Sequence, residues 1–475
     1  MYQKNETRVL VVSLVVTLSL VAVGAWWLLS RLRLQLNPAP KTATLTATTT
    51  LTTMTASNPE VKVRLSGGEK ALIVSIANLE KQVAVEAIKA GDYQKAVSKL
   101  EAALKLDRND PEILIYLNNA RIGEQKFYTI AASVPIGSDV NAAKEMLRGV
   151  AQAQNEINKT GGIKGVPLKV IIADDNNHPE VAKKVAVKLV NKSEVLGVVG
   201  HYASDVTIGT ADIYQSGELV AISPISTSVK LSGLSNYVFR TVPSDYVAAR
   251  ALADYMLRGL KQQKAAVFYN SESGYSRSLK SEFVTAVSLG GGQIVSEFDL
   301  SNPNFSAAGS LAQAIKSDAQ VLMLAANGST LDKALQVVKV NRKRLSILGG
   351  DAVYKPKTLQ VGAEEAEDMV VAIPWHILGS PRSEFTKTAN QLWVGEVNWR
   401  SALSYDAAKA LISAIEKNPS RSGVQQALSA SNFYVSGASG VIRFLPSGDR
   451  NQGVQLVKIQ SGSRTSFSHE FVPVP

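Results

Sequence analysis

The sequence predicts an α/β protein whose main part, residues 127–475, folds into two lobes. Short apolar runs alternate there with amphipathic helical segments, which is the pattern of βαβ units and of a parallel sheet. Nine such runs are spread over about 350 residues, more strands than one sheet usually holds, so two sheets are expected. The chain has no cysteine, which excludes a disulfide framework, a cysteine nucleophile and a lipidated cysteine anchor.

The N-terminal segment predicts membrane attachment by the peptide chain itself. Val9–Leu29 carries no charge, and at about 1.5 Å per residue it reaches roughly the 30 Å thickness of a bilayer core. Arg8 and Arg31 bracket the segment, and two tryptophans lie where an aromatic belt is expected. The apolar run is longer than the core of a cleaved signal peptide, so residues 1–30 are interpreted as an uncleaved transmembrane anchor.

A linker and a helical segment follow the anchor. Residues 31–58 are interpreted as the linker, because nine of the fifteen residues from Lys41 to Thr55 are threonine, without helical or strand periodicity. Residues 59–126 show the spacing of two antiparallel helices, and GDYQKAVSKLEAALKLDRNDPE resembles a tetratricopeptide repeat, with Arg108 where a proline is usual. One repeat cannot form a solenoid. A partner-binding element and an ordinary helical hairpin packed on the next domain are equally consistent with it.

The lobes are built from strands and helices that alternate along the chain. The strand candidates are 127–133, 168–174, 195–200, 219–223, 265–269, 293–298, 319–324, 345–350 and 368–373. Helices are expected between them at 141–158, 179–191, 204–215, 244–261, 275–288 and 329–340.

The residue patterns that mark common enzymes are missing from this sequence. It has no GxSxG, no HExxH, no Walker loop and no GxGxxG after a strand. The four histidines have no paired spacing, so neither a metal site nor a cofactor is expected. The net charge of +11 is dispersed, without a basic block or interleaved aromatics, and does not indicate nucleic-acid binding. The sequence therefore predicts a protein that is not an enzyme.

Small hydroxyl side chains and one isolated acid follow the strands instead. Ser204 begins a helix after one strand, Ser226 and Thr227 follow the next, and Asp351 comes after two glycines beyond a later strand. Open parallel sheets bind ligands at the carboxyl ends of their strands. Hydroxyls and helix N–H groups suit a carboxylate, and a lone acid suits an ammonium. Together these residues predict a site for a zwitterion.

Several stretches of the sequence also resemble a known family. VVGHYAS, ISPIST, VFRTVPSD, LGGD and SYDAAKALISAIE occur in the same order in the periplasmic leucine/isoleucine/valine-binding proteins, the type I solute receptors of ABC transporters. The resemblance covers the chain from about Tyr128 to the C-terminus. It implies two parallel, doubly wound sheets joined by three crossovers. The first lobe is expected at residues 127–246 and 376–440, and the second at 247–375 and 441–475.

The resemblance also implies roles for particular residues. Ser204 and Thr227 fall on positions whose hydroxyls hold the ligand carboxylate, with the backbone of Ile225 and Ser226 beside them. Asp351 falls on the acid that pairs with the ligand ammonium.

Three further positions concern the aromatic walls of that site. Tyr275 falls on an aromatic position of the second lobe, whereas Asn327 replaces a tyrosine there. The stretch PIGSDVN supplies no aromatic after the first strand, and Tyr202 is a candidate to restore that wall or to pack in the core. These departures weaken the expectation of a branched-chain ligand.

The expected function is that of a membrane-tethered, extracytoplasmic receptor that closes on an amino acid or a similar small zwitterion. Its partner would be an ABC permease or a signalling protein. The alternative is an envelope interaction or regulatory protein that keeps the receptor fold without a ligand and works through its helical segment.

Overall fold

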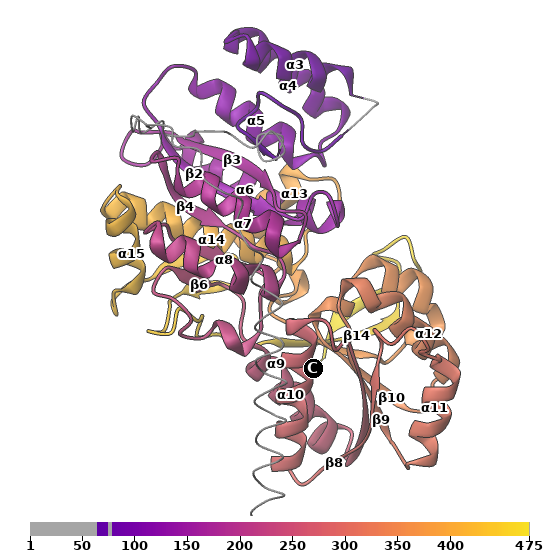
Figure 1. Cartoon of the computed structure of the whole chain (residues 1–475). Helices are drawn as coiled ribbons and strands as arrows, with labels where there is room; N and C mark the ends of the chain where they lie inside the picture. The colour runs from indigo at the N-terminus through magenta and orange to yellow at the C-terminus, as the bar shows by residue number, and fades with distance from the viewer. Residues whose placement is uncertain (1–63, 75–77, 475) are drawn as a thin grey trace, which may run out of the picture. The chain divides into compact units, whose positions relative to one another are not determined.

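Two mixed β-sheets organise the described part of the chain, and all but one of their strands lie from residue 128 onward (Figure 1). The first sheet contains, in spatial order, β1 (Leu65–Ser66), β3 (Leu168–Asp174), β2 (Tyr128–Val134), β4 (Val195–Val199), β5 (Ala221–Ser223) and β6 (Val238–Arg240). The second contains β15 (His469–Pro473), β14 (Gln455–Ser461), β11 (Val370–Ile373), β10 (Ser346–Gly349), β9 (Val321–Ala325), β7 (Lys264–Tyr269) and β8 (Gln293–Asp299). The nine predicted strands are all present. The sheets are not purely parallel as expected, because β1, β14 and β15 pair antiparallel with their neighbours.

The computed structural model describes residues 64–74 and 78–474. The predicted anchor at Val9–Leu29 and the threonine-rich linker lie outside the described residues. In the part of the chain that is described, none of the helices combines the length and the apolar character needed to cross a bilayer.

Helices cover both faces of each sheet. Those of the first lobe are α6 (Val140–Lys159), α7 (Pro179–Val190), α8 (Ser204–Ser216), α13 (Glu384–Leu392), α14 (Trp399–Lys417) and α15 (Arg421–Ser429). Those of the second lobe are α9 (Asp245–Asp254), α10 (Gly274–Leu289), α11 (Ala307–Lys316) and α12 (Leu331–Asn341). Figure 1 shows α9 and α10 on one face of the second sheet and α11 and α12 on the other. A small hairpin, β12 (Val435–Gly437) and β13 (Gly440–Ile442), packs beside α14.

The central strands have apolar sequences because both of their faces are buried. In β2, Ile130 and Ala132 belong to the core cluster that also contains apolar residues of α6 and α14, whereas Ala131 belongs to the cluster under α7 and α8. In β7, Val267 and Phe268 are divided in the same way between two clusters. Because successive side chains of a strand point to opposite faces, such strands read as continuous apolar runs.

The chain passes between the two lobes three times, after β6, after β11 and after β13. The third passage lies beyond Arg450, later than the boundary expected at residue 440. Arg450 forms a buried ion pair with Asp406 of α14 at 2.8 Å, and Asp449 pairs with Arg240 of β6 at 2.7 Å. These two pairs keep residues 443–450 with the first lobe.

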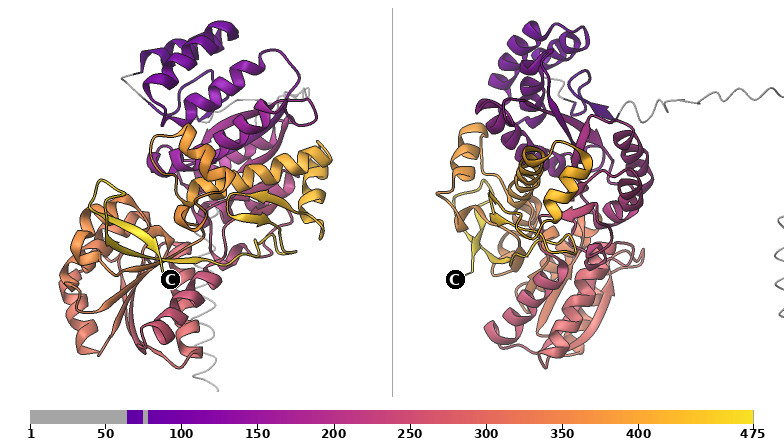
Figure 2. Two further views of the ribbon diagram at one scale, coloured as in Figure 1. Left: turned by 180° about the vertical axis from the view of Figure 1, so that it is seen from behind. Right: turned by 90° about the vertical axis from the view of Figure 1, so that its left-hand side faces the viewer.

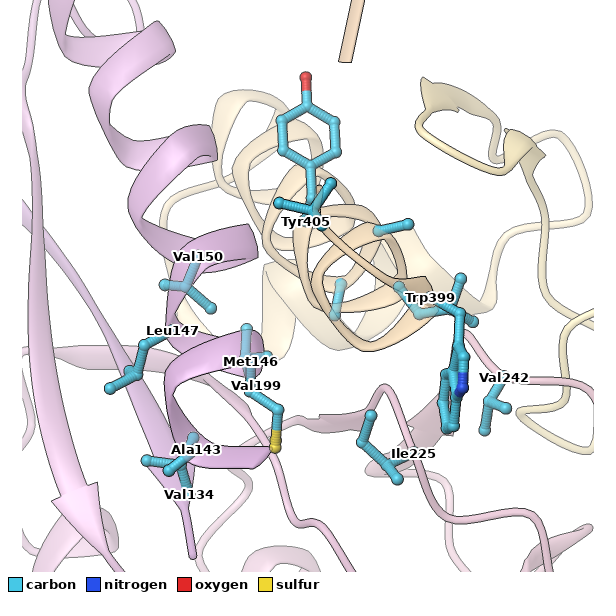
Figure 3. Close-up of a cluster of buried hydrophobic side chains, with 14 of the residues drawn as sticks. Val134, Ala143, Met146, Leu147, Val150, Val199, Ile225, Val242, Trp399 and Tyr405 are labelled. Atoms are coloured by element: carbon cyan, nitrogen blue, oxygen red, sulfur yellow. The ribbon is translucent and has the colours of Figure 1, made fainter. Parts of the chain in front are cut away.

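Helices α6 and α14 come from distant parts of the sequence but pack together in the first lobe (Figure 2). Met146, Leu147 and Val150 of α6 and Trp399 and Tyr405 of α14 belong to one buried cluster, part of which is drawn in Figure 3. The two helices begin next to the same cavity, described below. Their contact therefore positions residues from opposite ends of the chain.

The predicted helical hairpin is present, but a third helix follows it. The segment contains α3 (Leu79–Lys89), α4 (Tyr93–Leu106) and α5 (Pro111–Ile122), and its apolar side chains share one buried cluster with the first lobe. Asn119 of α5 fixes the segment to the sheet, because its side-chain amide donates to the carbonyl of Val170 in β3 and accepts from the N–H of the same residue. Its relation to tetratricopeptide repeats stays a prediction.

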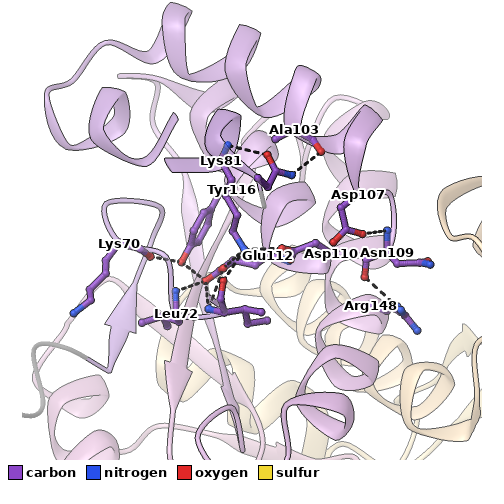
Figure 4. Close-up of polar contacts among 12 residues, drawn as sticks. Lys70, Leu72, Lys81, Ala103, Asp107, Asn109, Asp110, Glu112, Tyr116 and Arg148 are labelled. Carbon is purple, nitrogen blue, oxygen red and sulfur yellow. Dashed lines mark hydrogen bonds and ion pairs between the residues drawn. The ribbon is translucent and has the colours of Figure 1, made fainter. Parts of the chain in front are cut away.

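A buried ion network stabilises this helical segment (Figure 4). The Lys81 ammonium lies 2.6 Å from a carboxylate oxygen of Asp110 and 2.6 Å from one of Glu112, and all three side chains are at most 1% exposed. Glu112 also accepts hydrogen bonds from the backbone N–H of Leu72 and from the hydroxyl of Tyr116. The network joins α3, α5 and the chain before α3.

Candidate ligand-binding site

A cavity of about 340 Å³ lies between residues of the two lobes, beside the carboxyl ends of several strands. The first lobe contributes Ser138, Asp139, Asn177, Tyr202, Ala203, Ser204, Ile225 and Arg400. The second lobe contributes Ser273, Tyr275, Asn327, Gly328, Ser329, Asp351 and Ala352. Six of the eight predicted site residues are therefore brought together at this cavity.

The first-lobe wall contains the beginning of helix α8. Ser204 is the first residue of that helix, and the preceding Ala203 has no side chain that can cap it. The Ser204 hydroxyl accepts a hydrogen bond from the N–H of Ser228 at 3.2 Å, so its own proton remains available to an acceptor in the cavity. The hydroxyl and the positive end of the helix dipole together suit a carboxylate. Ile225 and Tyr202 complete this wall.

The second-lobe wall contains a coupled tyrosine and aspartate. The Tyr275 hydroxyl donates to a carboxylate oxygen of Asp351 at 2.6 Å. Burial raises the pKa of Asp351, although the hydrogen bond from Tyr275 and the charge of Arg400 oppose the shift. Glycine is required at position 350, because any side chain there would collide with Tyr275 and Leu279. The close approach of the ring to Asp351 therefore depends on Gly350.

The other predicted residues lie in different surroundings. The side-chain oxygen of Asn327 accepts from the side chains of Asn270 and Thr330, so this residue organises the loop after β9. Ser226 and Thr227 do not line the cavity. The Ser226 hydroxyl lies 2.8 Å from that of Thr207, and the Thr227 hydroxyl is buried without a hydrogen-bond partner.

Asp245, which was not predicted, lies next to Thr227 at the first passage between lobes. Its N–H donates to the carbonyl of Thr227 at 2.8 Å. Burial raises the pKa of Asp245 to about 7, and the charge of Asp351 contributes in the same direction. One of its carboxylate oxygens has no hydrogen-bond partner. A buried acid thus stands beside the chain segment that connects the two lobes.

Two charged residues of the cavity were also missed from the sequence. Asp139 caps α6 by accepting from the N–H of Ala142, and Arg400 is the second residue of α14. Neither follows a predicted strand directly, which is where the sequence was searched. Arg400 does stand four residues before the SYDAAKALISAIE stretch that resembles the family, and this position was the available signal.

Direct contacts hold the two walls of the cavity near each other. Asp205 of α8 accepts from the N–H of Gly274, the first residue of α10, at 2.7 Å. Asp139 forms an ion pair with Lys355 across the lobes at 2.7 Å. Burial opposes ionisation of Asp139, but the Lys355 ammonium and the helix N–H outweigh it and lower the pKa of this acid. The pair is therefore charged on both sides at neutral pH.

Within the described ranges, no group of three or more histidine, aspartate or glutamate side chains is arranged to hold a metal ion. His201 lies 2.6 Å from Asp175 and 2.9 Å from the hydroxyl of Tyr214, but all three are fully buried in the first lobe and none lines the cavity.

Comparison with known proteins agrees with this arrangement. A family model described as a periplasmic binding protein matches residues 128–464. An amino acid binding protein of Pseudomonas aeruginosa is 34% identical over 139 residues, which are 29% of this chain and 37% of that protein. A Leu/Ile/Val-binding protein of Rhizobium johnstonii is 26% identical over 345 residues, which are 70% of this chain and 92% of that protein.

A solved structure extends the likeness to the fold. The ABC transporter substrate-binding protein of Desulfitobacterium hafniense in complex with Leu superposes with a TM-score of 0.62 at 22% identity. The match covers 73% of this chain and all of that one. At this identity the likeness concerns the fold. The helical segment before residue 128 lies outside the family match.

Proposed function

Because the chain belongs to the periplasmic binding protein family, whose members are extracytoplasmic solute receptors and not enzymes, we propose that it binds a free amino acid or a similar small zwitterion between its lobes. The observation that carries this proposal is the cavity with Ser204 and the start of α8 on one wall and the Tyr275–Asp351 pair on the other. The first wall suits a carboxylate and the second an ammonium. A ligand that spans both walls stabilises the closed arrangement of the lobes.

The proposal is tested by replacing the acid of the ammonium wall. Asp351→Asn keeps the shape of the side chain and removes its charge, so the affinity for any amino acid that the wild type binds is expected to fall about ten- to a hundredfold. Titration calorimetry measures the change. Asp318→Asn is the matched control, because Asp318 also lies in the second lobe but its side chain is 79% exposed. An affinity unchanged by Asp351→Asn would show that the acid does not contact the ligand.

We also propose that Val9–Leu29 tethers this receptor to a membrane. The support is the length and apolar character of that segment in the sequence. Deleting residues 1–58 is expected to release the protein from membranes without changing the shift in melting temperature that a bound amino acid produces. Sequencing of the mature N-terminus is the control, since a chain that begins after residue 30 would contradict the tether.

The partner of the receptor is proposed to be an ABC permease, as for the family relatives, or a signalling protein that contacts the helical segment at α3 to α5. A second candidate function is an interaction protein that binds no small ligand. The three-helix segment favours it, because it precedes the region that matches the family. Failure of a broad panel of amino acids and small polar solutes to raise the melting temperature, together with binding of an envelope protein to this segment, would favour that second function.

A further inference from the structure

We propose that the ligand is an amino acid with a second carboxylate, and that Arg400 binds this carboxylate; the inference rests on the receptor function proposed above. Arg400 is only 3% exposed, yet it lines the cavity. Its two terminal nitrogens donate to the carbonyls of Tyr354 and Asp351 at 3.2 and 3.4 Å, which are long hydrogen bonds. Its Nε is buried without a partner.

No carboxylate of the described residues lies within ion-pair distance of this guanidinium, although its charge favours the ionised forms of Asp351 and Asp139. The guanidinium stacks on the ring of Trp399, with its central carbon 4.3 Å from the ring centre, but a neutral ring supplies no counter-charge. A buried cation without a counter-charge is costly, and the cost disappears when an anion binds. Because the residue opens onto the ligand cavity, the geometry assigns that anion to the ligand.

The other charged groups of the cavity indicate which part of the ligand carries the negative charge that pairs with Arg400. Asp139 already has its counter-charge in Lys355, and Asp351 is the acid assigned to the ligand ammonium. The α-carboxylate is assigned to Ser204 and the start of α8. A neutral zwitterion uses these groups and leaves Arg400 unpaired. A second carboxylate on the ligand side chain pairs with it.

The walls of the cavity agree with a polar side chain. Their aliphatic carbon comes from Ala203, Ile225 and Ala352, while most other lining residues carry a hydroxyl, amide or charged group. A branched aliphatic side chain needs a predominantly apolar pocket to be bound well. The cavity has apolar surface as well, so the support for a polar side chain is the presence of these hydroxyl, amide and charged groups beside Arg400.

Beyond Arg400 the cleft continues into a second cavity whose lining includes lysine side chains. This cavity of about 620 Å³ shares Asp139, Gly328 and Arg400 with the first and is further lined by Lys144, Lys355 and Lys357. Lys355 is paired with Asp139 and Lys357 with Asp332, so Lys144 is the lysine of this lining for which no such ion pair is found among the described residues. Because this second cavity adjoins the first, there is also room for an acidic side chain longer than that of aspartate.

The wild-type full chain, purified in detergent, provides the first test. Titration calorimetry compares L-aspartate, L-glutamate and L-2-aminoadipate with L-asparagine, L-glutamine and L-leucine. We expect at least one dicarboxylic amino acid to bind about ten- to a hundredfold more tightly than its amide or than leucine, because only the acid pairs with the guanidinium. Glutarate, which lacks the ammonium, is expected to bind much more weakly than glutamate.

The variant Arg400→Met then assigns the preference to this residue. In Arg400→Met, the affinity for a dicarboxylic amino acid is expected to lie within about threefold of the affinity for its amide. Arg400→Lys keeps a positive charge and is expected to retain part of the preference for the acid. Arg258→Met is the matched control, because it removes the same charge from a side chain that is 84% exposed and is expected to leave the ratio unchanged. The melting temperature of each unliganded variant reports whether it is folded.

Three results would overturn the inference. If amides or leucine bind as tightly as the acids, the receptor stands and the second carboxylate is wrong. If Arg400→Met weakens acids and amides equally, the residue holds the α-carboxylate common to both. If none of the amino acids binds to the wild type, the inference fails together with the proposed function, and that outcome is distinct from the first two.

Discussion

Replacing Gly149 with alanine is expected to lower the free energy of unfolding by about 3 kcal/mol, although alanine normally stabilises a helix relative to glycine. Gly149 lies in α6 where this helix crosses α14. A Cβ atom at this position would lie 2.6 Å from the backbone nitrogen of Tyr405 and still closer to the carbonyl oxygen of Ser401. Neither is the end of a flexible side chain, so the helices themselves must move apart.

Gly149→Ala is also expected to alter the ligand site. Helix α6 begins after Asp139 and α14 begins just before Arg400, so separating the helices displaces two lining residues of the cavity. Urea unfolding followed by tryptophan fluorescence measures the stability, and calorimetry measures ligand affinity. Gly209→Ala in α8 is the control, because the nearest atom to its added Cβ is 3.5 Å away. That variant is expected to be as stable as the wild type or up to about 1 kcal/mol more stable. Equal stability of the Gly149 variant and the wild type would refute the close contact of α6 and α14.

The fold was largely predictable because its strands are buried on both faces. Most of the nine predicted strands appear in the sequence as continuous apolar runs, and their lengths distinguish them from helices; β8, with Ser296 and Glu297, is the partly exposed exception. The strands that were missed are short or half-exposed. β6 has three residues, and Lys458 of β14 and Glu470 of the edge strand β15 break the apolar pattern.

The site was predictable only where it depends on local sequence. Ser204 and Asp351 were found because they follow strands directly. Arg400 was not, since its place in the cavity depends on the packing of α14 against α6 and on two passages of the chain between lobes. Ser226 was assigned to the site on the same rule as Ser204, but its hydroxyl turns to Thr207 and the cavity does not include it. Strand ends specify an edge of the sheet, whereas the direction of each side chain depends on tertiary contacts.

The third helix of the N-terminal segment was missed for a related reason. Almost every residue of α5 is buried, so it lacks the amphipathic spacing by which a helix is recognised. Its position depends on Asn119, which bonds to β3, and on Glu112, which bonds to the chain before α3. Buried polar groups, and not periodicity, therefore determine how this segment meets the first lobe.

The largest expected effect concerns the buried ion network of that segment. Lys81→Met removes the one ammonium that lies within 2.6 Å of both Asp110 and Glu112, and leaves two carboxylates buried without a counter-charge. Removing one partner of a buried ion pair costs about 3 to 5 kcal/mol. The loss is expected to appear in urea unfolding and as faster amide hydrogen exchange in residues 78–122.

Two further variants separate the charge effect from the loss of a packed side chain. Lys99→Met is the matched control, because its ion pair with Glu80 is about one-third exposed and such pairs contribute about 0 to 1 kcal/mol. Adding Glu112→Gln to Lys81→Met removes one of the two unpaired charges while keeping a side chain that accepts from Leu72 and Tyr116. The double variant is therefore expected to be more stable than Lys81→Met alone. The single variant Glu112→Gln completes the comparison. If the double variant loses as much stability as the two single variants together, the ammonium stabilises the segment through its hydrogen bond to the Ile73 carbonyl and not through the carboxylates.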